Sequence, residues 1–448
     1  MKIAVAGLGT VGAGTVKVLQ DNADLLSSRS GRSIQVTAVS ARDKSRDRGV
    51  PLDGYAFFED AVEMAAKADA DVVVELIGGE NGVAKDVVEA AIKSGKHVVT
   101  ANKALVAHHG TALANAAEQA GVTLNYEAAV AGGIPVIKSL REGLAGNKLS
   151  SVYGILNGTC NYILSRMRNE GLDFAEVLDD AQRLGFAEAD PSFDIDGVDA
   201  AHKLAILASV AFGRNVDFGS VYIEGIRQVS QLDIQFAEEL GYRIKLLGIA
   251  AETDHGIEQR VHPCMVPDSA PIASVEDVFN AVVAEGDQVG TLMLEGRGAG
   301  AGPTASAVVG DLVDIARGIS LPTFGIPVGD LRAAEPASMD RHFGAYYIRL
   351  TVIDEPGLVA DVAAVLRDND VSMESILQHG RDPGEQVSLH DVPGTFEGFP
   401  RAGGRGVGTR NFVVILGTTS RAGPFAQAVA DQFEDAPSRF KNIDGVVA

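Results

Sequence analysis

Residues 2–14, KIAVAGLGTVGAG, decide the fold of the N-terminal part of this chain. A short apolar run is followed by GxGxxG and then by an amphipathic stretch, which predicts a strand, a tight turn and a helix. Glycine lets the backbone approach a pyrophosphate, and the helix N-terminus offers unpaired N–H groups and the positive end of its dipole. We therefore predict a dinucleotide site, and glycines that serve only a tight turn are the alternative. The residues predicted to line this site are Gly7, Gly9, Thr10, Val11 and Gly12.

This turn begins a repeating pattern. Apolar runs of strand length alternate with amphipathic stretches of helical length. The predicted strands span residues 34–40, 71–77, 97–100 and 122–126, and the predicted helices span 83–94 and 111–120. Such alternation is typical of a parallel, doubly wound sheet. Residues 1–130 are therefore predicted to form a Rossmann-type NAD(P)-binding domain.

The loop after the second predicted strand bears on which nicotinamide nucleotide the site binds. An NAD site usually places an acidic residue there, against the ribose 2′-hydroxyl. This chain has Arg42, Lys44 and Arg46 in the run SARDKSRDRG, where the extra phosphate of NADP would lie. The cluster favours NADP, while the adjacent Asp43 keeps NAD open. A solvated loop of mixed charge is the alternative.

Composition argues against several classes of function. The 448 residues suggest about three domains, and 46% hydrophobic with 22% charged residues is typical of a globular protein. A formal net charge of −22 repels phosphate backbones and anionic membrane surfaces. We therefore expect neither nucleic acid nor a membrane as a partner.

Cysteines and targeting signals are sparse. Cys160 and Cys264 lie far apart, without a CxxC or a His-rich neighbourhood, so neither a zinc site nor a disulfide framework is predicted. The sequence shows no cleavable signal, and no apolar run reaches the ~18 residues that a membrane helix requires. We expect a cytoplasmic protein.

Two lysines with nearby carboxylates point to chemistry on a small zwitterionic substrate. Lys103 in HVVTANK follows the strand at 97–100, at the sheet edge where doubly wound folds bind ligands, and an exposed surface lysine is the alternative. Lys203 ends GFAEADPSFDIDGVDAAHK and is predicted to open an apolar helix, four residues after Asp199 and on the same helix face. Burial lowers the pKa of a lysine toward the range that suits proton transfer. A surface i,i+4 ion pair is the alternative.

Six ordered motifs resemble the homoserine dehydrogenases. They are GLGTVG (7–12), VVVELIGG (72–79), TANKALVA (100–107), YEAAVAGGIP (126–135), GILNGTCNYIL (154–164) and AEADPSFDIDGVDAAHK (187–203). The resemblance covers about residues 1–330. It implies an NADP-preferring enzyme that reversibly reduces L-aspartate 4-semialdehyde to L-homoserine in threonine, methionine and isoleucine biosynthesis.

The resemblance also implies roles for individual residues. Lys203 would give or take the proton, directly or through a water held by Asp199, while Glu188, Asp199 and Lys103 would hold the substrate. A cationic lysine beside a carbonyl stabilises the developing alkoxide and delivers the proton that accompanies a hydride. Cys160 stands where family members usually have threonine. Besides Lys103, which would also lie at the nicotinamide, the implied cofactor contacts are Gly185, Gly300 and Gly302.

A monovalent cation site, usually for sodium, is implied by the same resemblance. Backbone carbonyls with one carboxylate suit a hard cation, which prefers oxygen ligands. Read without the resemblance, the segment is only a turn before a helix. The matching positions are Glu127, Val130, Gly132 and Ile134.

Residues 131–320 are predicted to form a catalytic and dimerisation domain of mixed α+β type. IPVIKSLREGL is predicted to be one amphipathic helix, and Asn157 and Thr159 are predicted to cap the next one. Strand-like runs between 244 and 296 indicate an open sheet of a kind that often pairs subunits in a homo-oligomer. A glycine-rich turn then precedes a helix predicted to start near Thr304.

The C-terminal part resembles an ACT domain, a ferredoxin-like fold. A linker at 321–344 leads to residues 345–448, with strands predicted at 346–352, 371–377 and 411–420 and helices ending near 368 and spanning 423–432. ACT units typically pair and bind a free amino acid, so feedback control by threonine is implied. The glycine-rich stretch 394–408 departs from a simple hairpin. A domain that only mediates dimer or tetramer contacts is the alternative.

Two other functions remain to be separated from the leading one. Another amino-aldehyde oxidoreductase would share this architecture, and an amino-acid sensor could retain an inactive dehydrogenase fold. A degenerate sensor should lack at least one of four residues that are all present here, namely Lys103, Glu188, Asp199 and Lys203. His108 and His109 are interpreted as polar residues at a helix start.

Overall fold

The computed structural model describes residues 1–339, 342, 344–353, 357–368, 372–378, 409–417 and 440–447. The chain divides into two compact units. The first comprises Met1–Arg227, Lys245–His262 and Ser269–Ala337, and the second comprises Gln228–Ile244, Pro263–Asp268 and Ser338–Ala448. The predicted stretch at 394–408 and the predicted helix at 423–432 lie outside the described residues.

The N-terminal sheet is parallel and six-stranded, with the order β3-β2-β1-β4-β5-β6. Its central strands are buried on both faces, which explains why they read as uninterrupted apolar runs. The predicted Rossmann-type fold is confirmed. The strands are β1 (Lys2–Ala6), β2 (Gln35–Ser40), β3 (Ala56–Phe58), β4 (Val72–Glu75), β5 (His97–Thr100) and β6 (Leu124–Asn125), and the helices between them are α1 (Thr10–Asp21), α2 (Ala23–Ser30), α3 (Ala61–Lys67), α4 (Val83–Lys93) and α5 (Lys103–Ala120).

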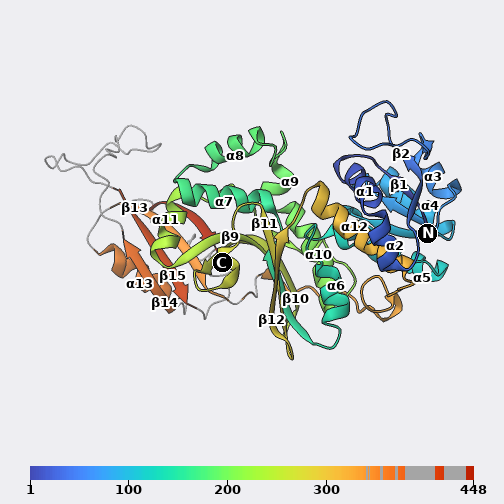
Figure 1. The fold of residues 1–448 in the computed structure, drawn as a ribbon. Helices are drawn as coiled ribbons and strands as arrows, with labels where there is room; N and C mark the ends of the chain where they lie inside the picture. Colours follow the sequence, from blue (N-terminus) through green and yellow to red (C-terminus); the bar gives the residue numbers. More distant parts are fainter. Residues whose placement is uncertain are drawn as a thin grey trace. The chain divides into compact units, whose positions relative to one another are not determined.

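Helices cover both faces of this sheet. One apolar cluster joins the sheet to α1 and α2, and the other joins it to α3, α4 and α5. Helix α12 (Ala301–Ala316) returns to the first face, where Val308 and Leu312 pack with Ile3 and Val5, and it runs beside α1 (Figure 1). The return of α12 brings its N-terminus to the glycine turn.

Helix α5 begins at Lys103, so the predicted start at 111 is wrong. The Asn102 side chain caps the helix by accepting a hydrogen bond from the backbone N–H of Leu105 at 3.1 Å. Gly110 lies within the helix, and a glycine suits this position because a Cβ there would lie 3.1 Å from the ring of Phe324. Lys103 is thus both the third residue after a strand and the first residue of a helix.

The second sheet has the order β12-β11-β7-β9-β10-β8. Helix α10 (Val198–Phe212) packs on it, and Gly248 allows the approach because a Cβ there would lie 2.8 Å from Leu156 and 3.5 Å from Leu204. Strands β9 to β12 of this sheet span the region between 244 and 296 in which a sheet was predicted. The strands are β7 (Leu149–Ile155), β8 (Tyr222–Ile223), β9 (Tyr242–Thr253), β10 (Gly256–Pro267), β11 (Phe279–Gly286) and β12 (Gly290–Arg297), and the other helices of this region are α7 (Gly158–Glu170), α8 (Phe174–Arg183), α9 (Ser192–Ile195) and α11 (Gln231–Glu239).

Two predicted helix starts are wrong, and one predicted helix is irregular. The stretch IPVIKSLREGL is helical, but only its first turn, α6 (Val136–Lys138), is an α-helix, and Ser139–Gly143 form a π-helical turn. Lys203 lies in the second turn of α10 and does not open it, because Gly197 with φ +86° already ends the preceding loop. Helix α12 begins at Ala301 and not near Thr304.

The C-terminal sheet is antiparallel, with the order β14-β15-β13-β16. This is the order of a ferredoxin-like β-α-β-β-α-β unit, in agreement with the predicted fold class. Among the described residues, no helix combines the length and apolar character that crossing a membrane requires. The elements are β13 (Tyr346–Ile353), α13 (Leu358–Asp368), β14 (Ser372–Gln378), β15 (Thr409–Gly417) and β16 (Phe440–Val447).

Candidate functional site

Two lysines share one buried carboxylate. Lys203 Nζ lies 2.6 Å from Asp199 Oδ2, and Lys103 Nζ lies 2.9 Å from Asp199 Oδ1. Lys203 also donates to the backbone carbonyl of Leu156 at 2.7 Å. The i,i+4 contact between Asp199 and Lys203 is as predicted. The sequence did not indicate that Lys103, from the nucleotide-binding domain, contacts the same carboxylate.

Electrostatics fix the charge of this group. Burial would raise the pKa of Asp199, but the two ammonium groups outweigh it and hold that pKa well below its usual range. Burial would likewise lower the pKa of Lys103, yet the Asp199 carboxylate, helped by Asp194 and Glu188, raises it. Asp199 is therefore ionised and Lys103 cationic around neutral pH.

Asn157 joins the loop before α7 to the carboxylates. Its side-chain nitrogen donates to Asp194 at 2.8 Å and to Asp199 at 2.9 Å, while its oxygen caps α7 by accepting from the backbone N–H of Cys160. The predicted cap at Asn157 is confirmed. Thr159 does not cap the helix, because its hydroxyl donates to the carbonyl of Phe186. Sequence reasoning missed the contacts of Asn157 with the carboxylates, since a helix cap explains the residue by itself.

Cys160 is buried beneath these groups. Its Sγ lies 3.2 Å from the carbonyl of Asp194. Burial, with the nearby Asp194 and Asp199 carboxylates, raises the pKa of the thiol well above its usual value. The thiol is therefore protonated and a poor nucleophile.

The segment between α8 and α9 borders the lysines. Gly185 has φ +78°, which favours glycine, and Glu188 is exposed, with its backbone carbonyl bonded to Gln182. The Glu188 carboxylate lies close enough to raise the pKa of Lys103, although no direct contact joins their side chains in the described part of the chain. The structure thus brings Glu188 near the lysine pair.

The glycine turn leaves room for a ligand. A Cβ at Gly12 would lie 1.9 Å from the carbonyl oxygen of Gly7, so only glycine fits there. A Cβ at Gly9 would meet no atom within 4 Å, and the first turn of α1, at Thr10 and Val11, receives no side-chain cap. These residues fit a pyrophosphate, whose oxygens would accept hydrogen bonds from the unpaired N–H groups.

The start of α12 completes this region. Gly300 precedes the helix with φ +118°, and Gly302 lies in its first turn. A Cβ at Gly14 would lie 3.0 Å from the carbonyl oxygen of Ala301, so the two helix starts are adjacent. Gly300 and Gly302 therefore lie close to the first turns of α1.

The basic loop after β2 has a feature that the sequence did not reveal. Arg42 and Lys44 are exposed. Arg48 donates from Nε to the carbonyl of Leu8 in the glycine turn at 3.1 Å, and from its terminal nitrogens to carbonyls of its own loop. Arg48 therefore fastens this loop to the turn. The contact spans 40 residues, and no local pattern predicts it.

Asp43 is the residue that leaves NAD possible as the cofactor in the sequence analysis, and its side chain bonds to its own loop. Its carboxylate accepts hydrogen bonds from the backbone N–H and the hydroxyl of Ser45 at 2.8 and 2.7 Å. The Ser45 hydroxyl lowers the pKa of Asp43. The carboxylate is thus already engaged.

The segment predicted to hold a cation is buried. The Glu127 carboxylate accepts from the backbone N–H groups of Ile137 and Lys138, both at 2.8 Å. Burial, together with the nearby Asp311 carboxylate, raises the pKa of Glu127 to about 7. The carboxylate therefore has backbone partners of its own.

Backbone carbonyls of this segment remain available. Those of Val130 and Gly132 accept no hydrogen bond within the described residues, whereas that of Ile134 accepts from Val136 at 2.7 Å. Gly132 has φ +52°, and a Cβ there would lie 2.3 Å from the carbonyl oxygen of Gly298. The Val130 and Gly132 carbonyls fit a hard cation. In the described part of the chain, His, Cys, Asp and Glu side chains form no cluster of three that could hold a metal ion.

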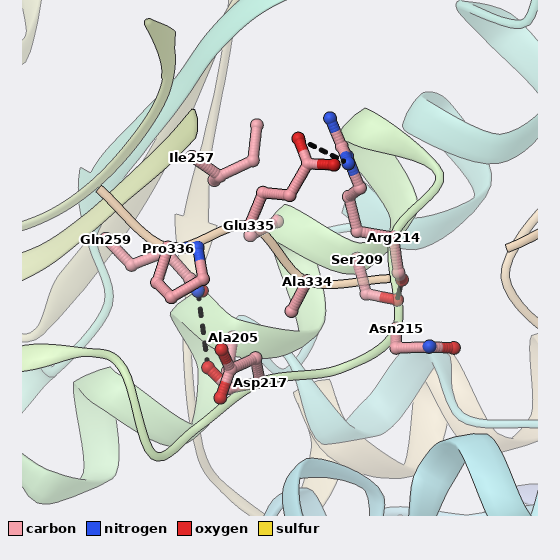
Figure 2. Close-up of a pocket in the computed structure, with 11 residues that line it drawn as sticks. Ala205, Ser209, Arg214, Asn215, Asp217, Ile257, Gln259, Ala334, Glu335 and Pro336 are labelled. Atoms are coloured by element: carbon pink, nitrogen blue, oxygen red, sulfur yellow. Dashed lines mark hydrogen bonds and ion pairs between the residues drawn. The ribbon is translucent and has the colours of Figure 1, made fainter. Parts of the chain in front are cut away.

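A separate small cavity lies at the C-terminal end of α10. Figure 2 shows Arg214 beside Glu335, with 3.2 Å between their charged groups, and Gln259 near Asp217. Its volume of about 10 Å³ is room for about one water molecule. This cavity is lined by none of the lysines or glycines described above.

Comparison with known proteins agrees with the geometry. Residues 7–127 match the family model for the NAD-binding domain of homoserine dehydrogenase, and residues 135–313 match the homoserine dehydrogenase model. Residues 398–448 match the model for the second domain of D-galactarate dehydratase/altronate hydrolase.

Individual relatives give the same result. The homoserine dehydrogenase of Neisseria gonorrhoeae is 48% identical over 386 residues, 85% of this chain and 88% of that protein. That of Pseudomonas aeruginosa is 47% identical over 390 residues, 84% of this chain and 88% of that protein. The crystal structure of a homoserine dehydrogenase from Thiobacillus denitrificans superposes with a TM-score of 0.88 at 40% identity, covering 100% of this chain and 97% of that one. The chain therefore belongs to the homoserine dehydrogenase family, NAD(P)-dependent oxidoreductases that act on a CH–OH group and interconvert L-homoserine and L-aspartate 4-semialdehyde.

Proposed function

We propose that Lys203 exchanges the proton with the substrate oxygen and that Asp199 holds Lys203 in place. The observation that carries this proposal is the single Asp199 carboxylate between two ammonium groups. The ammonium group of Lys203 stabilises the alkoxide that develops when the aldehyde is reduced.

Substrate binding follows from the same arrangement. The side chain of Lys103 is 35% exposed and that of Lys203 is 10% exposed, so Lys103 is the more accessible of the two to a bound ligand. Glu188 and Asp194 lie close enough to act on the pKa of Lys103, and such carboxylates suit the ammonium group of an amino acid. Holding both ends of the substrate orients it for reaction and discriminates against simple aldehydes.

The cofactor-binding residues proposed are the glycine turn, the start of α12 and Gly185. When bound, the nicotinamide nucleotide supplies or accepts the hydride. N–H groups of these residues would bind the pyrophosphate, and Lys103 would lie near the nicotinamide ring at the edge of the sheet. NADP is proposed as the preferred form because the Asp43 carboxylate is engaged with Ser45 while Arg42 and Lys44 are exposed.

Sodium is proposed at the Val130 and Gly132 carbonyls, with Glu127 and Ile134 beside them. A bound cation would favour the ionised form of Glu127, so its carboxylate would contribute negative charge nearby while it accepts two backbone hydrogen bonds. A specific site predicts that sodium raises the melting temperature more than lithium or choline does at equal ionic strength. Equal effects of the three cations would refute the site.

Regulation by threonine is proposed for residues 345–448, which we assign as an ACT domain after a linker at 321–344. The antiparallel order β14-β15-β13-β16 favours this assignment. The nucleotide-binding domain at 1–130 and the catalytic domain at 131–320 complete the proposed division, and we propose a dimer or tetramer located in the cytoplasm.

One assay tests these proposals together. Homoserine oxidation is followed spectrophotometrically with NADP and NAD in parallel, each with and without sodium and threonine. We expect a higher kcat/KM with NADP and inhibition by threonine. Equal kcat/KM for the two nucleotides would refute the preference, and unchanged rates with threonine would refute the regulatory role.

A further inference from the structure

A cluster of histidine and aromatic rings lies beside Lys103 and has no part in the proposed chemistry. His108 Nε2 lies 3.2 Å from His202 Nε2, and the His202 ring packs on Phe218 with centroids 4.3 Å apart and planes 30° apart. Phe193 also packs against the His202 ring, with centroids 5.6 Å apart. His202 is 4% exposed, so the cluster has a buried centre.

The hydrogen bonds of the cluster define one arrangement of protons. His108 Nε2 also lies 3.0 Å from Glu80 Oε2. Because a carboxylate accepts, His108 Nε2 carries the proton and His202 Nε2 accepts. The proton of His202 is then on Nδ1, a buried atom without a hydrogen-bond partner among the described residues. Burial, reinforced by His108, lowers the pKa of His202 to about 4, so this ring is neutral at working pH.

The cluster reaches the reactive site through Phe193. The ammonium nitrogen of Lys103 lies 5.5 Å from the centroid of the Phe193 ring, which is within cation–π range. The same Lys103 nitrogen lies 2.9 Å from the Asp199 carboxylate. A neutral His202 beside Phe193 adds no charge repulsion to the Lys103 ammonium group over that ring. Lys103 therefore has a charged partner and an aromatic partner, and the aromatic ring in turn packs against His202.

Three helices contribute residues to this cluster. Lys103 and His108 both belong to α5, Phe193 to α9 and His202 to α10. Glu80 lies in the turn after β4, which Asn102 also binds by donating to the carbonyl of Gly79 at 2.7 Å. Residues of the nucleotide-binding domain and of the catalytic domain thus both contact the first two turns of α5.

We propose that Phe193 and His202 are positioning residues for Lys103. The Phe193 ring holds the ammonium group by a cation–π contact, and His202 packs against that ring and holds it in place. The inference rests on the proposed role of Lys103 in substrate binding. It assigns a function to the aromatic residue of the acidic segment and to a histidine that exchanges no proton. Without the Phe193 ring, the Lys103 ammonium group can move, and ground-state binding of homoserine becomes weaker.

The test compares Phe193→Leu with Phe193→Tyr in the full chain. Phe193 is 42% exposed, so both variants are expected to fold. Phe193→Leu should raise the KM for homoserine about 2- to 10-fold, the size of one cation–π contact, with the KM for NADP and the melting temperature unchanged. Phe193→Tyr keeps the ring and should behave as the wild type. A folding defect would lower kcat through a smaller active fraction and leave the KM for homoserine unaltered.

Lys103→Met separates the two proposals. It should itself raise the KM for homoserine, and Phe193→Leu should then have no further effect in the Lys103→Met background. The same fold-change from Phe193→Leu in both backgrounds would overturn the positioning role, although Lys103 would keep its own. An unchanged KM in Lys103→Met would overturn the proposed substrate role of Lys103, and the inference with it.

His202→Leu tests the support. It removes the unpartnered Nδ1 proton, so the melting temperature should hold or rise while the KM for homoserine still increases. A KM equal to that of the wild type would remove His202 from the proposal.

Discussion

Lys203 Nζ lies 2.6 Å from Asp199 Oδ2, with both side chains buried on consecutive turns of α10. An isolated buried ion pair of this kind often contributes little to stability, because desolvation offsets the Coulomb attraction. The second ammonium group, from Lys103, changes this relationship. Asp199 faces two cations, and the Asp194 and Glu188 carboxylates lie near Lys103, so the site offers cations to a developing alkoxide and carboxylates to a substrate ammonium group.

Replacing Lys203 by methionine should abolish most of the activity. General acid–base catalysis contributes about 10² to 10⁴ in rate, so kcat should fall by that range while NADP binding changes little. Steady-state kinetics and a fluorescence titration with NADPH measure the two quantities. Lys67→Met, which breaks an exposed i,i+4 pair with Glu63, is the matched control and should retain wild-type kcat. Wild-type turnover in Lys203→Met would remove Lys203 from the proton transfer.

Asp199→Asn should destabilise the fold as well as lower activity. Breaking a buried pair by removing one partner costs roughly 3–5 kcal/mol, since both ammonium groups lose their carboxylate. The folded-state pKa of Asp199 is depressed, so its contribution is fully present above the unfolded pKa of about 3.9 and is lost as pH falls below that value.

The measurement is urea unfolding of wild type and Asp199→Asn between pH 8 and pH 3.5. The difference in unfolding free energy should be constant down to about pH 5 and shrink below about pH 4. A difference that grows on acidification would contradict the depressed pKa.

Two glycines of the same turn should respond differently to alanine. At Gly12 the added Cβ meets the carbonyl oxygen of Gly7, so Gly12→Ala should lower the melting temperature. At Gly9 the Cβ meets nothing in the protein and φ is −75°, so the fold should tolerate Gly9→Ala. The same methyl group would occupy the space of the pyrophosphate and raise the KM for NADP about tenfold, about 1.4 kcal/mol. Thermal unfolding and kinetics of the pair separate structure from ligand binding. A Gly9→Ala variant with normal KM would place the pyrophosphate elsewhere.

Local patterns predicted the parts of the site that depend on short spacing. The turn at Gly7 to Gly12 and the contact of Asp199 with Lys203 follow from periodicity and glycine geometry. The predicted helix at 111–120 started too late, because neither the cap at Asn102 nor the packing of Gly110 against Phe324 within the helix was identified from the sequence.

Contacts between distant segments could not be predicted in the same way. Lys103 and Asp199 are separated by 96 residues, and Arg48 and Leu8 by 40. Each depends on how one element returns to another, which the pattern within a segment does not contain. The neutral state of His202 likewise depends on burial among rings from other segments, namely His108, Phe193 and Phe218.

Arg48 and Arg42 should affect cofactor use in different ways. Arg48→Met removes the bond to Leu8 and frees the loop, so the KM should rise for NADP and NAD alike. Arg42→Met removes only a charge proposed to meet the 2′-phosphate, so the KM should rise for NADP alone. Parallel kinetics with both nucleotides measure the ratio. An NADP-selective loss in Arg48→Met would show that Arg48 itself contacts the phosphate.

The C-terminal sheet is joined to α11 by a buried carboxylate within the second unit. Asp233 accepts hydrogen bonds from the Tyr347 hydroxyl at 2.8 Å and from Arg349 Nε at 2.7 Å. Tyr347 also packs against Phe236 of α11. Deleting residues 345–448 would therefore leave Asp233 without two charge-assisted partners and would expose apolar surface.

We accordingly expect the deletion to abolish any threonine response and preserve kcat at low temperature, but to lower the melting temperature. Tyr347→Phe in the full chain is the control. It loses one hydrogen bond to a charged group, about 1.5–3 kcal/mol, and should keep the threonine response. Inhibition curves with threonine and thermal unfolding of the three proteins measure both effects. A truncated protein that threonine still inhibits would place the effector site outside residues 345–448.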